Sequence, residues 1–233
     1  MALPKIDMPI FEMSLPSSGK KVKYRQFTVK EEKILLISQE SKDIKTAINA
    51  VKQVVNNCLI DSNIEEFAMF DLEYILLLLR SKSIDNNVKF AIKDPDTDEK
   101  IELELDLNNV KVTNFENHTN KIDVNEEYTL FLKYPTIDQF TNFIEDEKKD
   151  PLTSYSVMIS CLDKIASKED VYKFSDYTQA EIDAFMDSLS GEVLMKIKLF
   201  FDTMPKLRHE MKYKNKNDVE KTFVLEGMQS FFI

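Results

Sequence analysis

The sequence predicts an α+β fold, and three patterns carry this prediction. Apolar and polar residues alternate at the amino end and again between Val88 and Leu107, which indicates β-hairpins. Five consecutive apolar residues at 75–79 leave a helix there without a polar face, as in a helix wrapped by other elements. Helical periodicity dominates after Thr136. We therefore expect an amino-terminal lobe of β-hairpins around a long amphipathic helix and a buried helix, and a helical carboxyl-terminal lobe ending in a short β-hairpin.

Length and charge limit the kinds of partner. With 233 residues, the chain can bury one large core or the cores of two small lobes. Its net charge of −10 argues against a nucleic-acid-binding surface, because phosphate binding relies on clustered Lys and Arg. The apolar run at residues 75–79 is far shorter than the roughly 20 residues that cross a bilayer, so no membrane span is predicted.

The start of the chain and the two cysteines indicate a reducing compartment. Lys5, Asp7 and Glu12 interrupt any apolar run at the start, so no signal peptide is predicted and we expect a cytoplasmic location. Cys58 and Cys161 are far apart in the sequence and make no disulfide framework. We expect both thiols to be reduced and to act as small apolar side chains.

The first predicted elements are a hairpin and a long helix. Residues 10–15 alternate in polarity, as do residues 22–24 on the return, and the Pro-Ser-Ser-Gly sequence at 16–19 supplies the turn. Thr28 and Glu31 form a capping box that opens a helix to about Asn57, with apolar residues at three-, four- and seven-residue steps. We expect this helix to pack antiparallel to the buried helix and against the hairpin.

The buried helix is predicted over residues 70–83. Asp71 stands where an N-cap is expected, with a carboxylate that can accept a free backbone N–H of the first turn. Arg80 and Lys82 place positive charge at the negative end of the helix dipole.

A change to period-two alternation marks a second hairpin, with strands at residues 88–92 and 101–107 and a polar turn between them. Residues 129–133 form a further strand. The turn contains Asp94, Asp96 and Asp98, spaced like the first ligands of an EF-hand calcium loop. The sixth position is Glu99 instead of Gly, and the twelfth is Leu105 instead of Glu. We therefore expect an exposed acidic turn and no metal site.

Pro135 marks a boundary, because a residue before proline favours extended backbone and Thr136 can cap a helix. Helices are predicted at residues 137–147, 152–165, 179–186 and 192–204. A terminal hairpin is predicted from residues 207–212 and 222–225. The expected domains are therefore an α+β lobe at 1–135, a helical lobe at 136–205, and a carboxyl-terminal hairpin and tail at 206–233.

No catalytic motif is apparent in the sequence. The three glycines are isolated, so no phosphate-binding loop, dinucleotide fingerprint or nucleophile elbow can be built from them. His118 and His209, the two histidines, belong to no metal-binding or protease signature, and we expect surface or locally hydrogen-bonded side chains. A pair of carboxylates at glycosidase separation stays open as an alternative, because carboxylates are abundant and nothing in the sequence selects one pair. We predict no cofactor and no enzymatic activity.

Four segments resemble the baseplate hub and hub-assembly proteins of T-even-type contractile-tailed phages, in the same order along the chain. They are the amino end with Leu15-Pro16-Ser17-Ser18-Gly19; Phe70-Asp71-Leu72-Glu73-Tyr74 with Leu79-Arg80-Ser81-Lys82-Ser83; Phe200-Phe201-Asp202-Thr203-Met204-Pro205-Lys206-Leu207; and Leu225-Glu226-Gly227-Met228-Gln229-Ser230-Phe231-Phe232. The resemblance spans nearly the whole chain.

This resemblance implies a non-enzymatic baseplate hub subunit, or an assembly factor that prepares the hub, acting through other hub and tail proteins. The expected location is the host cytoplasm during assembly, or the baseplate of the virion tail. An alternative is a transient chaperone or adaptor for a tail partner such as the tape-measure protein. Many family members carry cysteines in the terminal hairpin that look like a zinc ribbon, but residues 214–221 here contain none, so no metal is expected.

Four side chains are candidate contacts with partner subunits: Arg80, Lys82, Phe231 and Phe232. Arg80 and Lys82 lie on the flank of the buried helix, where the alternative is an ion pair within the chain. The two phenylalanines lie near the end of the sequence, where aromatic side chains either fold back on the core or dock into a neighbour.

Overall fold

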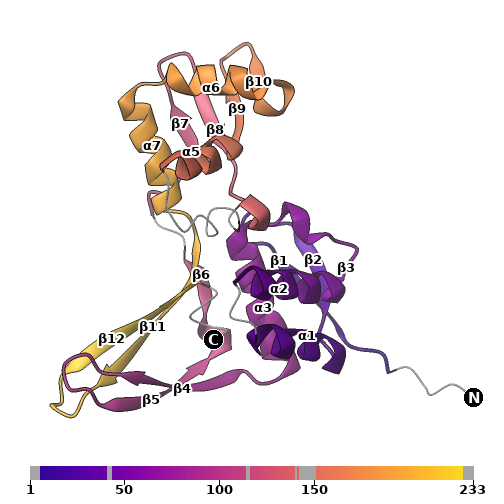
Figure 1. Ribbon diagram of the computed structural model, residues 1–233, viewed down its shortest axis with the longest axis vertical. Helices are drawn as coiled ribbons and strands as arrows, with labels where there is room; N and C mark the ends of the chain where they lie inside the picture. The colour runs from indigo at the N-terminus through magenta and orange to yellow at the C-terminus, as the bar shows by residue number, and fades with distance from the viewer. Residues whose placement is uncertain (1–5, 41–43, 114–115, 140, 142–150, 228–233) are drawn as a thin grey trace, which may run out of the picture. The chain divides into compact units, whose positions relative to one another are not determined.

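The computed structural model describes residues 6–40, 44–113, 116–139, 141 and 151–227 (Figure 1). Its contacts divide the chain into two units, one of residues 1–113 with 206–233 and one of residues 114–205. Strand β6 (Lys111–Thr113) precedes the second unit and strand β11 (Lys206–Lys214) follows it. Thr113 pairs with Lys206 in an antiparallel ladder, so the 114–205 unit is inserted between two adjacent points of the first unit.

The predicted α+β class is confirmed, and the amino-terminal hairpin forms as expected. Strands β1 (Ile10–Ser14) and β2 (Lys21–Arg25) pair antiparallel, and β2 also pairs with the short β3 (Leu59–Ile60). The turn closes through a hydrogen bond from the backbone N of Leu15 to the carbonyl of Lys20, 2.9 Å long. Gly19 has a φ of +70°, a left-handed conformation that glycine adopts without strain.

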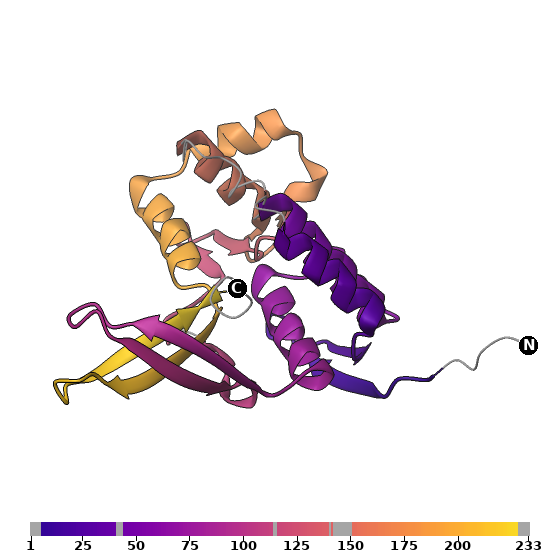
Figure 2. The same ribbon diagram turned by 60° about the horizontal axis from the view of Figure 1, so that its bottom comes forward.

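The single long helix expected to reach Asn57 is instead two helices. Helix α1 (Val29–Glu40) and helix α2 (Ile44–Cys58) contact each other side by side, which the two halves of one straight helix cannot do (Figures 1 and 2). The intervening Ser-Lys-Asp sequence at 41–43 explains the difference, because Ser and Asp favour helix starts over helix interiors. The predicted capping box at the start of α1 is present, with Glu31 accepting from the backbone N of Thr28 at 2.9 Å.

Helix α3 (Met69–Ser83) is the predicted buried helix. Its side chains at 72, 75, 77 and 79 are at most 1% exposed, so the helix is enclosed along most of its length. Its N-cap is Ala68, three residues earlier than predicted, so Asp71 is the third residue of the helix. The carboxylate of Asp71 still accepts a free N–H at this end, from Ala68 at 3.2 Å. The sequence places the helix start too late because Met69 and Phe70 are apolar and buried, and so extend the helix into the core.

The rest of the first unit is built from paired hairpins. Strands β4 (Asn87–Lys93) and β5 (Lys100–Asp106) form a two-stranded sheet, as predicted. Strand β11 pairs on one side with β12 (Glu220–Glu226) and on the other with β6, which confirms the terminal hairpin. These strands share a buried apolar cluster with α3, formed by Leu77, Leu105, Leu107, Val110, Leu207 and Leu225.

The second unit is a four-stranded antiparallel sheet with helices packed against it. The strand order is β10-β9-β8-β7, with bounds Val171–Lys173, Leu162–Ala166, Thr129–Leu132 and Lys121–Asp123. The helices are α5 (Pro151–Ser160), α6 (Gln179–Asp187) and α7 (Gly191–Asp202). One face of the sheet and the helices share an apolar core with Ile122, Leu130, Leu132, Leu162, Phe174, Met186, Val193, Ile197 and Phe200. Residues 137–139 and 141 are helical, and the rest of the helix expected to 147 lies outside the described residues.

Five strands, β3, β6, β7, β9 and β10, stand where the sequence indicates no strand. The helix expected over 152–165 ends at Ser160, and Leu162–Ala166 is strand β9, paired with β8 on one side and β10 on the other. The backbone N–H and C=O groups at the edge of β8 need hydrogen-bond partners. Pairing with β8 therefore decides the structure of residues 162–166, although the spacing of their apolar residues fits a helix. The second packing unit ends at Pro205, as the expected helical lobe does, but it begins at Asn114 because β7 and β8 pack with the helices that follow them; the division into domains stays a prediction.

Candidate functional site

The predicted contact residues of α3 occupy different environments. Arg80 is half-buried, and burial lowers the pKa of its guanidinium. Lys82 is exposed, and its Nζ lies 5.8 Å from the centre of the Phe11 ring on β1. Lys82 therefore ties α3 to the amino-terminal hairpin by a cation–π contact and leaves part of its charge facing solvent. Contact of either residue with a partner subunit stays a prediction.

Phe231 and Phe232 lie outside the described residues, of which Gly227 is the last. Gly227 has a φ of +71°, and a Cβ atom there would lie 3.6 Å from Oε1 of Glu73. The backbone of Gly227 thus reaches the side of the buried helix.

The reactive side chains considered in the sequence have structural roles. The ring nitrogens of His118 lie 3.0 Å from Oγ1 of Thr203 and 2.9 Å from the hydroxyl of Tyr134, which confirms a locally hydrogen-bonded histidine. Burial lowers the pKa of this imidazole. Cys58 and Cys161 are free, fully buried thiols, and burial raises the pKa of each to about 11. Neither cysteine is placed to act as a thiolate nucleophile.

The acidic turn between β4 and β5 binds a lysine of its own chain. Oδ1 of Asp94 accepts from the backbone of Asp96 and Thr97, whereas Oδ2 accepts from the hydroxyl of Tyr213 at 2.9 Å. Nζ of Lys221 lies 3.0 Å from the same Oδ2. Asp94 is therefore fully buried, which differs from the exposed tip expected, because it joins the β4–β5 turn to the β11–β12 hairpin. Within the described residues, no group of three or more His, Cys, Asp or Glu side chains could hold a metal ion.

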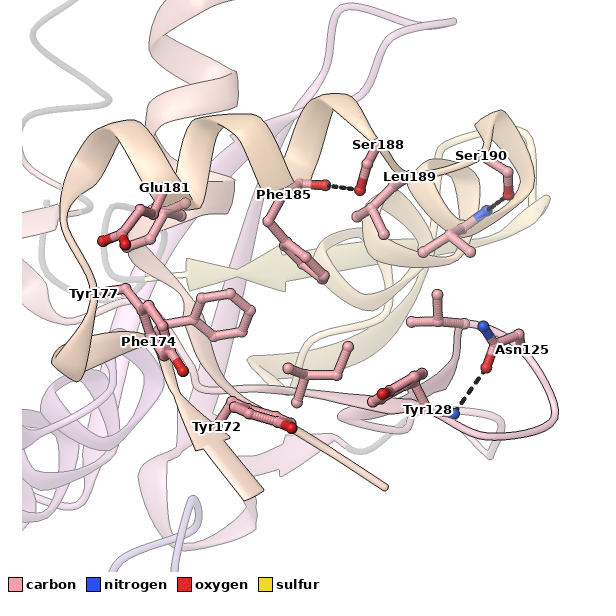
Figure 3. Close-up of a pocket in the computed structure, with 14 residues that line it drawn as sticks. Asn125, Tyr128, Tyr172, Phe174, Tyr177, Glu181, Phe185, Ser188, Leu189 and Ser190 are labelled. Carbon is pink, nitrogen blue, oxygen red and sulfur yellow. Dashed lines mark hydrogen bonds between the residues drawn. The ribbon is translucent and has the colours of Figure 1, made fainter. Parts of the chain in front are cut away.

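A groove of about 630 Å³ lies in the 114–205 unit (Figure 3). Tyr172 of strand β10 lies on one side of it, with Tyr128 from the loop between β7 and β8. Phe185 of α6 and Leu189 lie on the other side and point towards these residues. The fourteen lining residues are Val124, Asn125, Tyr128, Ile165, Tyr172, Phe174, Tyr177, Glu181, Ile182, Phe185, Ser188, Leu189, Ser190 and Val193.

Local hydrogen bonds shape the ends of this groove. Oδ1 of Asn125 accepts from the backbone N of Tyr128 at 2.8 Å, which holds the β7–β8 loop in place. Ser190 caps α7 by accepting from the backbone N of Val193 at 3.3 Å. Thr178 and Glu181 form the second predicted capping box, with bonds of 2.8 and 2.7 Å to the carboxylate. The groove is therefore lined by residues with fixed backbones.

Negative charge surrounds the groove. Glu181 is the one charged side chain among its lining residues, and the hydrogen bonds from Thr178 lower its pKa. The negative charge of Glu127 raises the pKa of the Tyr128 hydroxyl, and that of Asp170 raises the pKa of the Tyr172 hydroxyl. Between Asn114 and Pro205 the sequence has 18 Asp and Glu but 9 Lys, a net charge of −9 out of −10 for the whole chain.

Sequence reasoning did not find this groove. Residues 167–177 contain Tyr172, Phe174 and Tyr177, but their mixed polarity gives no helical or strand period. Two features of the sequence point to this region. Negative charge is concentrated after residue 113, and aromatic residues there belong to no segment with a helical or strand period. Assembly of the groove from the strands, α6 and α7 depends on the tertiary fold.

The comparison with protein families identifies the chain: the family described as T4 bacteriophage base plate protein matches residues 8–233. The chain belongs to this family. No curated protein and no solved structure matches it. Family membership confirms the resemblance to T-even-type phages and supports a structural role in the phage baseplate, with other phage tail proteins as partners. In the described part of the chain, no helix is long and apolar enough to cross a membrane.

Residues from each of the four segments that carry the resemblance meet at or around α3 of this baseplate protein. Ser17 donates to Asp71 through its backbone N at 2.9 Å and through its hydroxyl at 2.5 Å. Leu207 and Leu225, from the two later segments, belong to the same apolar cluster as Leu77. These segments therefore contribute to the core around the buried helix, whereas Phe200 of the third segment belongs to the core of the 114–205 unit. The groove lies outside all four segments.

Proposed function

We propose that this baseplate protein is a hub subunit or a hub-assembly factor, and that it works by binding other tail proteins and not by catalysis. The observation that carries the proposal is the family match over residues 8–233. In this role the chain binds one conformation of a partner more tightly than another, and so favours the form that enters the baseplate.

An exposed apolar face on α1 supports action through protein contacts. Val29, Leu36 and Ile37 are 66%, 55% and 70% exposed. Their spacing places them on one face of the helix, which gives an apolar stripe that a partner can cover.

The test is cross-linking and affinity capture of the tagged chain from phage-infected cells, followed by identification of the captured proteins. We expect hub and tail proteins with the unmodified chain. We expect their loss when Leu36 and Ile37 are both replaced by Glu, with an unchanged circular dichroism spectrum. Lys89→Glu, an exposed change on strand β4 and outside α1, is the matched control and should retain capture. Capture of the tape-measure protein alone would favour the chaperone alternative, and capture of no tail protein would contradict the proposal.

The same experiment tests the predicted contact residues. Lys82→Glu is the better probe of the α3 corner because Lys82 is exposed, whereas Arg80 is half-buried and its replacement is also expected to lower stability. Removal of residues 228–233 tests Phe231 and Phe232. If these variants fold normally and capture the same proteins as the unmodified chain, the assignment of these four residues to an interface is wrong.

A further inference from the structure

The groove of the 114–205 unit has the size and lining of a binding site for a large side chain. Its volume of about 630 Å³ falls within the roughly 300–1,000 Å³ of typical ligand pockets. Most of its lining is aliphatic or aromatic, and the tyrosines at its edge present both an apolar ring and a polar hydroxyl. Such tyrosines are typical of protein-binding surfaces.

The edge of the groove remains accessible in the folded chain. Tyr172 and Tyr177 are 38% and 43% exposed, and Val171 beside them is 60% exposed. Strand β10, which carries Tyr172, is an edge strand that pairs only with β9 among the described strands. An incoming segment can therefore reach the groove without unfolding any described element.

Charge selects the chemistry of that segment. Glu181 lines the groove. Glu127 precedes Tyr128 in the sequence, and the negative charge of Asp170 acts on the hydroxyl of Tyr172. No Lys or Arg is among the fourteen described lining residues. A partner with positive charge on both sides of an apolar side chain gains attraction in the low dielectric of the groove, whereas an acidic partner is repelled.

We propose that this groove binds a peptide segment of another baseplate protein in which a large apolar or aromatic side chain is flanked by Lys or Arg. The proposal rests on the proposed function, and adds the place and the chemistry of one partner contact. The apolar side chain enters between Phe185 and Tyr172, and the flanking cations lie near the carboxylates at the edge. The other unit is nearly neutral, so charge does not favour a second copy of this chain as the occupant.

The test uses the full chain and a fluorescent synthetic peptide with the sequence Lys-Lys-Leu-Phe-Lys-Lys. Fluorescence anisotropy should show saturable binding that weakens as salt is raised. Two further peptides are matched controls, one with Glu in place of every Lys and one with Ala in place of Leu and Phe. Both should bind at least about tenfold more weakly, because each loses one of the two contributions.

Variants of the chain test whether the peptide binds in the groove. Tyr128→Ala combined with Tyr172→Ala should weaken binding about tenfold or more, as should Glu127→Lys combined with Asp170→Lys. Asp163→Lys, an exposed charge change on β9 outside the lining residues, should weaken binding much less. Circular dichroism verifies that each variant folds.

Three results would overturn the proposal. They are equal binding of the acidic peptide, unchanged binding by the folded groove variants, and a concentration-dependent dimer that the groove variants abolish. The peptide assay and the capture from infected cells can fail separately. Loss of peptide binding with continued capture of tail proteins removes only the groove assignment, whereas peptide binding without such capture removes the baseplate role.

Discussion

Single carboxylates hold distant parts of the first unit together, and Asp71 is the clearest case. Its side chain is fully buried and accepts three hydrogen bonds, two from Ser17 and one from the backbone N of Ala68. Burial raises the pKa of this carboxyl group, and the three hydrogen bonds oppose that rise. The residue therefore fixes the start of α3 against the turn of the amino-terminal hairpin.

Replacing Asp71 with Ala should lower the free energy of unfolding by about 3 kcal/mol, because it leaves buried N–H donors without acceptors. Chemical denaturation monitored by circular dichroism measures the change. Asp163→Ala, at an exposed position, is the control and should stay within about 0.5 kcal/mol of the unmodified chain. A similar small effect for both variants would show that Asp71 does not hold the helix start.

A second carboxylate makes stability depend on pH. Glu31 is 2% exposed; burial alone would raise its pKa, but hydrogen bonds from Arg25 and Thr28 outweigh burial and lower the pKa from 4.5 to about 2. Because the folded pKa lies below the unfolded one, the stabilisation is complete above pH 4.5 and is lost as pH falls towards about 2.

Glu31→Gln should remove this pH dependence. We expect the unmodified chain to lose about 2 kcal/mol of stability from this residue between pH 6 and pH 2, and the variant to lose correspondingly less over the same range. Urea denaturation at pH 6, 4 and 3 measures both slopes. Equal slopes for the two proteins would contradict the role of the Arg25–Glu31 ion pair.

At the scale of elements, local patterns predict well where a segment carries its own period or cap. The hairpin at the amino end, the buried α3 and the capped α6 all follow from residues within or next to each element. Prediction from sequence fails where the secondary structure of a segment depends on its contacts with distant parts of the chain. Strand β9, for example, follows from its pairing with β8. The groove is missed for the same reason, since its lining residues come from elements far apart in the sequence.

The link between the β4–β5 turn and the β11–β12 hairpin can be broken selectively. Asp94→Asn keeps the side-chain oxygen that accepts from Asp96 and Thr97, but replaces the oxygen that faces Lys221 with an amide NH₂ group. In the unmodified chain, burial would raise the pKa of Asp94, but the hydrogen bonds from Lys221, Tyr213 and Thr97 lower it.

We expect faster amide hydrogen exchange at the tips of both hairpins in Asp94→Asn and unchanged exchange in the 114–205 unit. Asp96→Asn is the matched control, because Asp96 is 68% exposed and its ion pair with Lys221 is weakened by solvent. Faster exchange at one hairpin only would show that Asp94 does not couple the two.

At the scale of the whole molecule, the chain is one α+β unit with a second unit inserted into it. The inserted unit has its own apolar core, and the chain leaves and re-enters the first unit at the paired residues Thr113 and Lys206. Nearly all the net negative charge lies in the insertion, whereas Leu207 and Leu225, from two of the segments that carry the family resemblance, pack around α3 in the first unit. Each unit thus has its own apolar core, and the negative charge on which the proposed groove contact depends is concentrated in the inserted unit.

Each unit should therefore fold alone. We expect residues 114–205, expressed separately, to unfold cooperatively on heating, because their core is complete within these limits. The complementary variant joins Thr113 to Lys206 through a short Gly-Ser linker and should also unfold cooperatively. A fragment without a cooperative transition would show that the insertion needs the first unit to fold. Cooperative unfolding of residues 136–205 alone would instead favour the division at 135.

The most direct test of the baseplate role is quantitative mass spectrometry of purified virions and of infected-cell lysate. A hub subunit should be present in virions at a fixed copy number relative to other baseplate proteins. A hub-assembly factor should be present in the lysate in complexes with tail proteins and absent from virions. Either result agrees with the proposed function and decides between its two forms. Presence in neither virions nor tail-protein complexes would contradict it.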